Sequence, residues 1–145
     1  MTERIVVQRT VPAPVLVVFD YWTSPEHLQA WFRYGPDWDN TVAEIDCRRG
    51  GAYRLGMRSA DGTEFSVFGE FIDVEPPNRL VYSWRVASNP DQTTEVTVQF
   101  DEHPDGTQVT LTHTHFATPE SAQGHQTGWN NCIDALVACV QATNP

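Results

Sequence analysis

Cationic side chains are scarce in this sequence, which has 9 lysine and arginine residues against 19 aspartate and glutamate residues. The formal net charge is −10 at pH 7, and the sequence pI is about 4.7. Proteins that bind nucleic acid or an anionic membrane surface need clustered lysine and arginine side chains to neutralise phosphate groups. The charge therefore argues against both classes of partner, and we expect neither a nucleic acid nor a membrane.

Cysteines are also few, and their spacing does not suit a disulfide. Cys47, Cys132 and Cys139 form no Cys-x-x-Cys motif, and the last two are about 10 Å apart along a predicted helix. An odd number of unpaired thiols is typical of a reducing compartment. The N-terminus lacks the apolar core of a signal peptide, and no apolar run approaches the roughly 18 residues of a membrane span. We therefore predict a cytoplasmic protein.

Sequence signatures of catalysis are missing as well. The chain has no His-Glu-x-x-His motif, no phosphate loop, no dinucleotide fingerprint and no nucleophile–base pair. We therefore expect no metal and no cofactor, and we assign no catalytic residue. The chain has 145 residues and is 40% hydrophobic, which predicts one domain over residues 1–145 with a substantial core.

The strongest helical pattern covers residues 118–142. Thr118, Pro119 and Glu120 provide a capping hydroxyl, a first-turn proline and an acid at the positive end of the helix dipole. Apolar residues then recur in one stripe of a 3.6-residue helix: Trp129, Ile133, Leu136, Val137 and Val140. A long helix with one apolar stripe needs a broad apolar surface to cover.

The preceding chain predicts a sheet that would provide this surface. A β-branched strand over residues 5–11 is followed by a helix from about residue 14 to 21 and by a second helix that starts at Ser24-Pro25-Glu26. Six further strands are predicted, over residues 41–47, 52–58, 64–74, 79–86, 95–100 and 107–116. Gly69 predicts a bulge or a bend. The result is an α+β fold, in which a curved antiparallel sheet of six to seven strands wraps around a long C-terminal helix and leaves a cavity between them.

Motifs along nearly the whole chain resemble those of one family. They are Pro14-x-x-x-Val18-Phe19, Trp31-Phe32, Gly51-x-Tyr53-x-Leu55, the run from Gly69 to Trp84, Leu111-Thr112-His113 and Gly128-Trp129-x-x-Cys132-Ile133-x-x-Leu136. Together with the order of elements, they are similar to the helix-grip fold of the START-like (Bet v 1-like, SRPBCC) superfamily, and within it to domains related to the activator of Hsp90 ATPase. This resemblance implies an internal pocket but no particular reaction, because the superfamily contains binders, cyclases, oxygenase domains and cochaperones.

Histidines are the first candidates for chemistry. His113 and His115 have the same parity in the last predicted strand, and His125 lies near the start of the facing helix. Three imidazoles in one place would suit zinc or iron. The alternative, which we favour in the absence of a metal motif, is that they lie at a strand end and are solvated or bonded to backbone.

Glu70 is the second candidate. If its strand turns Ile72 and Glu70 inward, Glu70 is a buried carboxylate with a raised pKa and a candidate acid or base. If Val67 and Phe71 point inward instead, Glu70 is a solvated surface charge, and we favour this alternative.

Aromatic residues predict the lining of a ligand pocket. Tyrosine and tryptophan combine an apolar body with one polar group, which suits an apolar ligand that carries one or two polar groups; the alternative is ordinary core packing. The residues expected to line the pocket come from the short helices, the strands and the last helix: Trp31, Phe32, Tyr53, Leu55, Tyr82, Trp84, His113, His115, Trp129 and Ile133.

Three functions follow from these patterns. The leading hypothesis is a domain that binds an apolar or aromatic small molecule between the sheet and the last helix. One alternative is a module that interacts with a chaperone. The other is an acid–base enzyme, a cyclase, isomerase or hydrolase, that uses His113 with Tyr82 or Glu70. A homodimer formed through a strand edge is left open.

Overall fold

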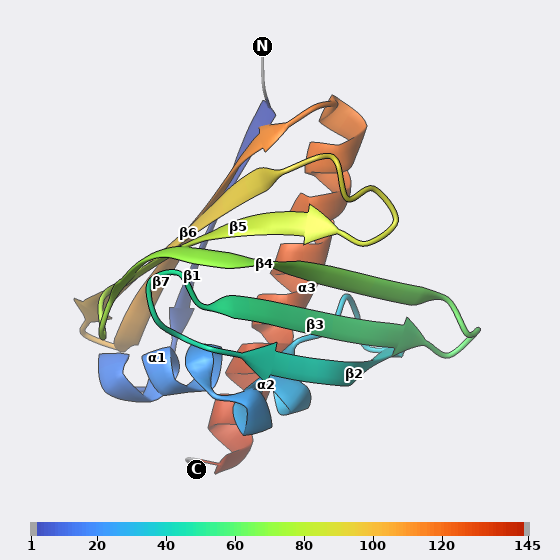
Figure 1. Ribbon diagram of the computed structural model, residues 1–145. Helices are drawn as coiled ribbons and strands as arrows, with labels where there is room; N and C mark the ends of the chain where they lie inside the picture. Colours follow the sequence, from blue (N-terminus) through green and yellow to red (C-terminus); the bar gives the residue numbers. More distant parts are fainter. Residues whose placement is uncertain (1–2, 144–145) are drawn as a thin grey trace.

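The computed structural model describes residues 3–143. Seven antiparallel strands form one sheet in the order β1-β7-β6-β5-β4-β3-β2 (Figure 1). The elements are β1 (Glu3–Val11), α1 (Val15–Thr23), α2 (Pro25–Trp31), β2 (Trp38–Ile45), β3 (Ala52–Ser59), β4 (Glu64–Glu75), β5 (Arg79–Val86), β6 (Thr94–His103), β7 (Gly106–Phe116) and α3 (Pro119–Thr143). The predicted order of elements, the long final helix and the curved sheet are confirmed.

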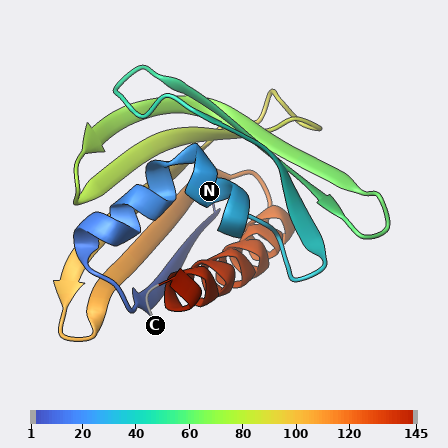
Figure 2. The same ribbon diagram turned by 90° about the horizontal axis from the view of Figure 1, so that it is seen from below.

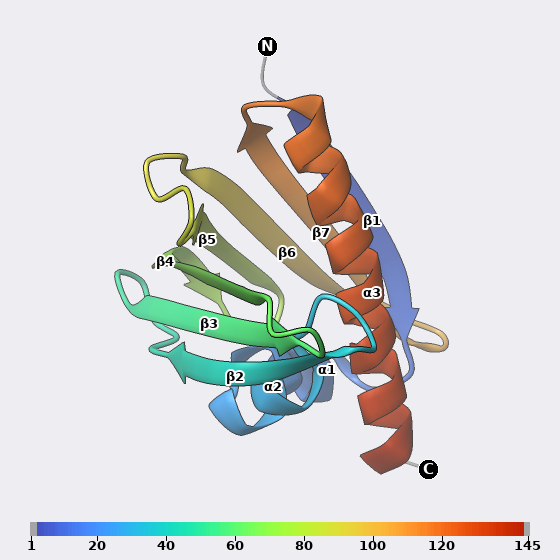
Figure 3. The ribbon, with the colours of Figure 1, turned by 90° about the vertical axis from the view of Figure 1, so that its right-hand side faces the viewer.

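The sheet curls around the three helices. Seen from below, it is an arc whose concave side holds α1, α2 and α3 (Figure 2). The long helix α3 packs against β1 and β7, while α1 packs against β6 and α2 against β2 (Figure 3). Because α3 lies close to only one side of the arc, side chains rather than backbone fill the space between α3 and the strands β3, β4 and β5. Within residues 3–143, no helix is both long and apolar enough to cross a membrane.

Alternation along the strands builds the core as the sequence predicts. In β6, Val96, Val98 and Phe100 are fully buried, and the residues between them are exposed or half-buried. On α3, the predicted stripe is buried at Trp129 and at Ile133, Leu136 and Val140, while Val137 is half-buried. Apolar area removed from water in this way contributes roughly 25 cal/mol per Å² to folding.

Of three local expectations, two differ from the structure and one is confirmed. The second strand is β2, Trp38–Ile45, rather than residues 41–47, because pairing with β3 already begins at Trp38 opposite Ser59. Thr118 caps α3 as expected, with its Oγ accepting a hydrogen bond from the Ser121 N–H at 3.1 Å. Ser24 does not cap α2 through its side chain, because its hydroxyl bonds to the Glu26 carboxylate at 2.8 Å.

The bend expected at Gly69 has a different cause. The register of β4 against β5 shifts between Phe71 and Asp73, not at Gly69. At Gly69 a Cβ atom would lie 2.1 Å from the carbonyl oxygen of Ser83. Glycine is therefore required there because the two strands approach closely, and no side chain would fit.

Candidate functional site

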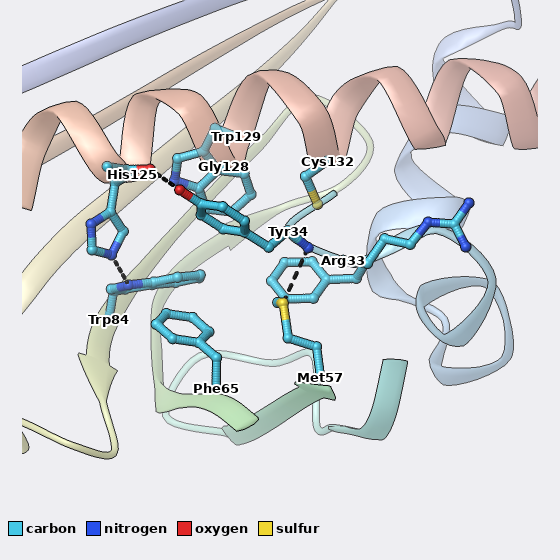
Figure 4. A pocket seen from close by; sticks show the side chains of 11 residues that line it. Arg33, Tyr34, Met57, Phe65, Trp84, His125, Gly128, Trp129 and Cys132 are labelled. Atoms are coloured by element: carbon cyan, nitrogen blue, oxygen red, sulfur yellow. Dashed lines mark hydrogen bonds between the residues drawn. The ribbon is translucent and has the colours of Figure 1, made fainter. Parts of the chain in front are cut away.

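A small pocket lies between α3 and the strands β3 to β5, and its cavity volume is about 80 Å³ (Figure 4). Five lining residues come from α3 and three from the strands, and the segment after α2 closes the remaining side. These residues are Gly124, His125, Gly128, Trp129 and Cys132 on α3, then Met57, Phe65 and Trp84, and finally Phe32, Arg33 and Tyr34. We call this cavity the inner pocket.

Two glycines four residues apart shape the α3 side of the inner pocket. A Cβ atom on Gly128 would lie 2.8 Å from Cε1 of Tyr34, whereas a Cβ atom on Gly124 would meet no atom within 4 Å. Gly128 thus allows the ring of Tyr34 to pack directly on the helix, and Gly124 leaves space unfilled. Glycine in a helix interior is about 1 kcal/mol less favourable than alanine, so both glycines lower the intrinsic stability of α3.

Tyr34 closes the pocket between α3 and β3. Its hydroxyl donates to the carbonyl oxygen of Gly124 at 3.3 Å, and its backbone N–H donates to the sulfur of Met57 at 3.1 Å. The neighbouring Arg33 points away from the cavity (Figure 4). The segment after α2 therefore contributes an aromatic face to the inner pocket and keeps its positive charge outside.

His113 is fully buried behind Trp129, and both of its ring nitrogens have protein partners. The indole Nε1–H of Trp129 donates to Nδ1 at 3.0 Å, and Nε2 lies 2.7 Å from Oγ1 of Thr94. An indole nitrogen can only donate, so Nδ1 is unprotonated and the proton is on Nε2. The series of hydrogen bonds continues from Thr94, whose hydroxyl donates to the carbonyl oxygen of Trp84 at 3.1 Å.

His125 repeats this pairing with the other indole of the pocket. The Nε1–H of Trp84 donates to Nε2 of His125 at 3.1 Å (Figure 4). The opposite nitrogen, Nδ1, lies 2.9 Å from the carbonyl oxygen of Ser121, which can only accept. The proton of His125 is therefore on Nδ1, and the ring is a neutral acceptor toward Trp84.

Burial sets the protonation of these groups. Burial, with a smaller contribution from the neighbouring His125, lowers the pKa of His113 from 6.5 to about 2. Burial also lowers the pKa of His125, against the opposing effect of the Ser121 carbonyl. It raises the pKa of the Cys132 thiol to about 12. Desolvation disfavours the charged forms of these three side chains, so both imidazoles and the thiol are neutral near pH 7.

The predicted lining residues fall into three groups. Phe32, Trp84 and Trp129 line the inner pocket. Phe32 also borders a separate crevice of about 20 Å³, together with three further predicted residues: Tyr53, Leu55 and Tyr82. The other inward residues, Trp31, Ile133 and His113, are fully buried in the core and do not line the inner pocket.

His115 does not share the inward face of His113. Its backbone φ is +75°, and the register of β7 against β1 shifts between His113 and Phe116. The irregularity reverses the alternation, so Phe116 is buried and His115 is exposed. The cluster of three histidines, the less favoured interpretation, is therefore not formed. The favoured alternative is wrong for His113, which is fully buried and bonded to the side chains of Thr94 and Trp129. Among residues 3–143, no group of three His, Cys, Asp or Glu side chains is placed to hold a metal ion.

The acid–base pairs considered from the sequence are not brought together. Glu70 is exposed, as in the favoured interpretation, and borders an open hollow of about 640 Å³ on the other face of the sheet. Tyr82 pairs with Val96, which pairs with His113, so their backbones are two strand spacings, about 10 Å, apart. The Tyr82 hydroxyl accepts from the indole of Trp22 at 3.3 Å, and burial raises its pKa.

Sequence reasoning missed several residues of the site: Tyr34, Met57, Phe65, Gly124 and Gly128. The glycine pair did carry a signal, because two glycines in the interior of a long helix reduce its stability and so require another reason to be there. Tyr34 carried no such signal, because it lies in the connection between α2 and β2, where no helical or strand periodicity indicates which way a side chain points.

Comparison with known proteins agrees with this fold. The family model described as "Activator of Hsp90 ATPase homolog 1-like protein" matches residues 12–141, whereas no curated protein matches the sequence. Among solved structures, the AHSA1-like protein from Aeromonas hydrophila has 28% identity and a TM-score of 0.80, with 97% of this chain and 94% of that chain covered.

Two further structures are similar. A protein from Rhodobacter sphaeroides has 25% identity and a TM-score of 0.83, over 98% of this chain and 95% of that one. The AHSA1 protein from Silicibacter pomeroyi, at 18% identity, shares the fold, with a TM-score of 0.83 over 98% and 100% of the two chains. Because the family model spans most of the sequence, the chain belongs to the activator of Hsp90 ATPase homolog 1-like family.

Proposed function

We propose that this protein binds a small apolar or aromatic molecule in the inner pocket, between the sheet and α3. One observation carries the proposal: the pocket has aromatic and sulfur-containing walls in which the polar atoms of Tyr34, Trp84 and Trp129 are already hydrogen-bonded within the protein. A wall without free polar groups favours an apolar ligand, because a polar ligand would lose its hydration without gaining partners.

The size of the cavity limits what fits inside. About 80 Å³ is several times the roughly 10–15 Å³ that one water molecule requires. It is below the roughly 300–1,000 Å³ of sites that enclose a drug-sized ligand. The inner pocket therefore accepts one ring or a short alkyl group, and a larger ligand extends beyond it.

Binding without turnover fits the electrostatics of the site better than acid–base catalysis. A general base must be within hydrogen-bond reach of the ligand and must have a pKa near the working pH. His113 has both nitrogens engaged by Trp129 and Thr94, and its pKa is about 2. The enzyme alternative lacks a free acid or base at the pocket wall among the residues described. A chaperone partner, a homodimer and a cytoplasmic location stay predictions from the sequence.

The test is a titration with toluene, a neutral one-ring ligand within the size limit of the inner pocket, followed by tryptophan fluorescence, since Trp84 and Trp129 line the cavity. The blocking variant is Gly124→Leu, since a side chain at this position enters unfilled space. The matched control is Gln126→Leu, which adds the same side chain to the exposed face of the same helix. We expect saturable binding to the wild type and to the control, with affinity reduced about tenfold or more in Gly124→Leu. Absence of saturable binding, or equal affinity in all three proteins, would refute the proposal.

A further inference from the structure

A second cavity lies beside the inner pocket and shares part of its wall. Its volume is about 230 Å³, and it has Phe65, Trp84 and His125 in common with the inner pocket. We call this second cavity the vestibule. On its far side it is lined by polar residues that are exposed or half-buried, among them Ser88, Asn89, Gln92 and Ser121. The vestibule therefore gives solvent, and a ligand, one approach to the shared wall.

Two hydrogen bonds between neutral groups hold His125 in the shared wall, because its Nε2 accepts from Trp84 and its Nδ1–H donates to the carbonyl oxygen of Ser121 at 2.9 Å. Trp84 Nε1 and His125 Nε2 are 3.1 Å apart, and the two rings meet edge to face at 75° with centroids 6.0 Å apart (Figure 4). A single neutral hydrogen bond is worth only a factor of roughly two to ten in an equilibrium constant. Rotation of His125 away from Trp84 would join the two cavities and would release the indole N–H toward the vestibule.

Formal charge is almost absent from the combined lining. Arg33 is the one lysine, arginine, aspartate or glutamate among the residues described that line either cavity, and its side chain points away from the inner pocket (Figure 4). The hydroxyl and amide side chains of the vestibule, in contrast, supply both donors and acceptors. An ionised head group would be partly dehydrated there without a counter-ion, whereas an uncharged polar group would find partners.

We propose that Trp84 and His125 form a displaceable partition in a single two-part site whose ligand is an uncharged amphiphile. The apolar ring or chain occupies the inner pocket, and a hydroxyl, ketone or amide group lies in the vestibule, where its oxygen replaces His125 as the acceptor for Trp84 Nε1–H. This inference rests on the proposed function, because it requires that the inner pocket binds the apolar part.

Three ligands with the same phenylpropyl body and different head groups test the ligand class: 3-phenylpropan-1-ol, 3-phenylpropanoate and 3-phenylpropylamine, each titrated at pH 7.5 with tryptophan fluorescence as the readout. The alcohol is expected to bind about tenfold or more tightly than either ion. Equal affinity for the alcohol and one of the ions would overturn the inference while leaving the proposed function intact. If toluene does not bind, the proposed function fails, and this inference fails with it.

Variants of the partition provide the second readout. His125→Ala removes the bond to be broken, so 3-phenylpropan-1-ol should associate faster and bind about two to ten times more tightly. His125→Gln retains an acceptor for the indole and should stay close to the wild type. Trp84→Phe removes the same bond from the other side and should also speed association, which keeps the test valid if His125→Ala does not fold. Equal association rates in the wild type and in the folded variants would overturn the partition.

Discussion

One substitution at two positions of α3 is expected to have opposite effects on stability. Gly124 and Gly128 lie four residues apart in the interior of the 25-residue helix. Replacing glycine by alanine in a helix interior stabilises it by about 1 kcal/mol. At Gly124 the new methyl group would meet no atom within 4 Å, so Gly124→Ala should gain the whole of this amount.

At Gly128 the same methyl group would collide with Tyr34, at 2.8 Å from Cε1 and 2.9 Å from Cδ1. Forcing an extra group into packed surroundings typically costs about 1–3 kcal/mol, and displacing the ring also weakens the bond from the Tyr34 hydroxyl to Gly124, worth about 1 kcal/mol. After the gain in helix propensity, Gly128→Ala should be destabilised by about 1–3 kcal/mol.

Urea denaturation followed by circular dichroism would measure both free energies of unfolding. In thermal melts the same changes correspond to about 2–4 °C per kcal/mol for a chain of this size. Stabilisation of both variants would show that Tyr34 does not pack on Gly128. Destabilisation of both would show that the space at Gly124 is already filled. The expected result means that Gly124 lowers stability in exchange for an open pocket, a compromise typical of binding sites.

The remaining predictions concern the buried network and the helix cap. The depressed pKa of His113, about 2 against 6.5, contributes stability that is complete above pH 6.5 and declines as the pH falls toward 2. Between about pH 6.5 and 4.5 the wild type should lose about 2–3 kcal/mol of its free energy of unfolding. Urea titrations should show no such loss in His113→Gln, and the same pH dependence in both proteins would contradict this. Trp129→Phe leaves Nδ1 of His113 unpaired and should cost about 1–3 kcal/mol, so an unchanged melting temperature would argue against that bond. Thr118→Ala removes the cap of α3 and should cost about 1 kcal/mol, with an unchanged urea midpoint as the contrary result.

The architecture was predictable because alternation and helical periodicity agree with each other along the chain. Val96, Val98 and Phe100 are buried on one face of β6 as their spacing indicates. The alternation rule failed at His115, where a positive φ reverses the direction of the following side chains. Parity assumes a regular backbone, and nothing in the local sequence at His115 predicts that the backbone is irregular there.

The site was less predictable than the fold because its open space depends on contacts between distant segments. Whether Trp84 lines a cavity or fills it depends on His125, 41 residues away. Tyr53 and Tyr82 are aromatic like Trp84, yet their ring centroids are only 5.3 Å apart, and the crevice beside them has a volume of only about 20 Å³. Composition indicated an aromatic interior, but only the three-dimensional packing distinguishes the aromatic residues that line a cavity from those that fill the core.

The most direct test of ligand binding is a two-dimensional NMR spectrum of the ¹⁵N-labelled tryptophan indoles during titration with 3-phenylpropan-1-ol. Trp84 and Trp129 line the inner pocket, whereas the indole of Trp31 is buried against the carbonyl oxygen of Tyr21 at 2.8 Å and borders neither cavity. The account predicts saturable shifts of the Trp84 and Trp129 indole signals and an unmoved Trp31 signal. Shifts that do not saturate, or that appear only at Trp31, would contradict it.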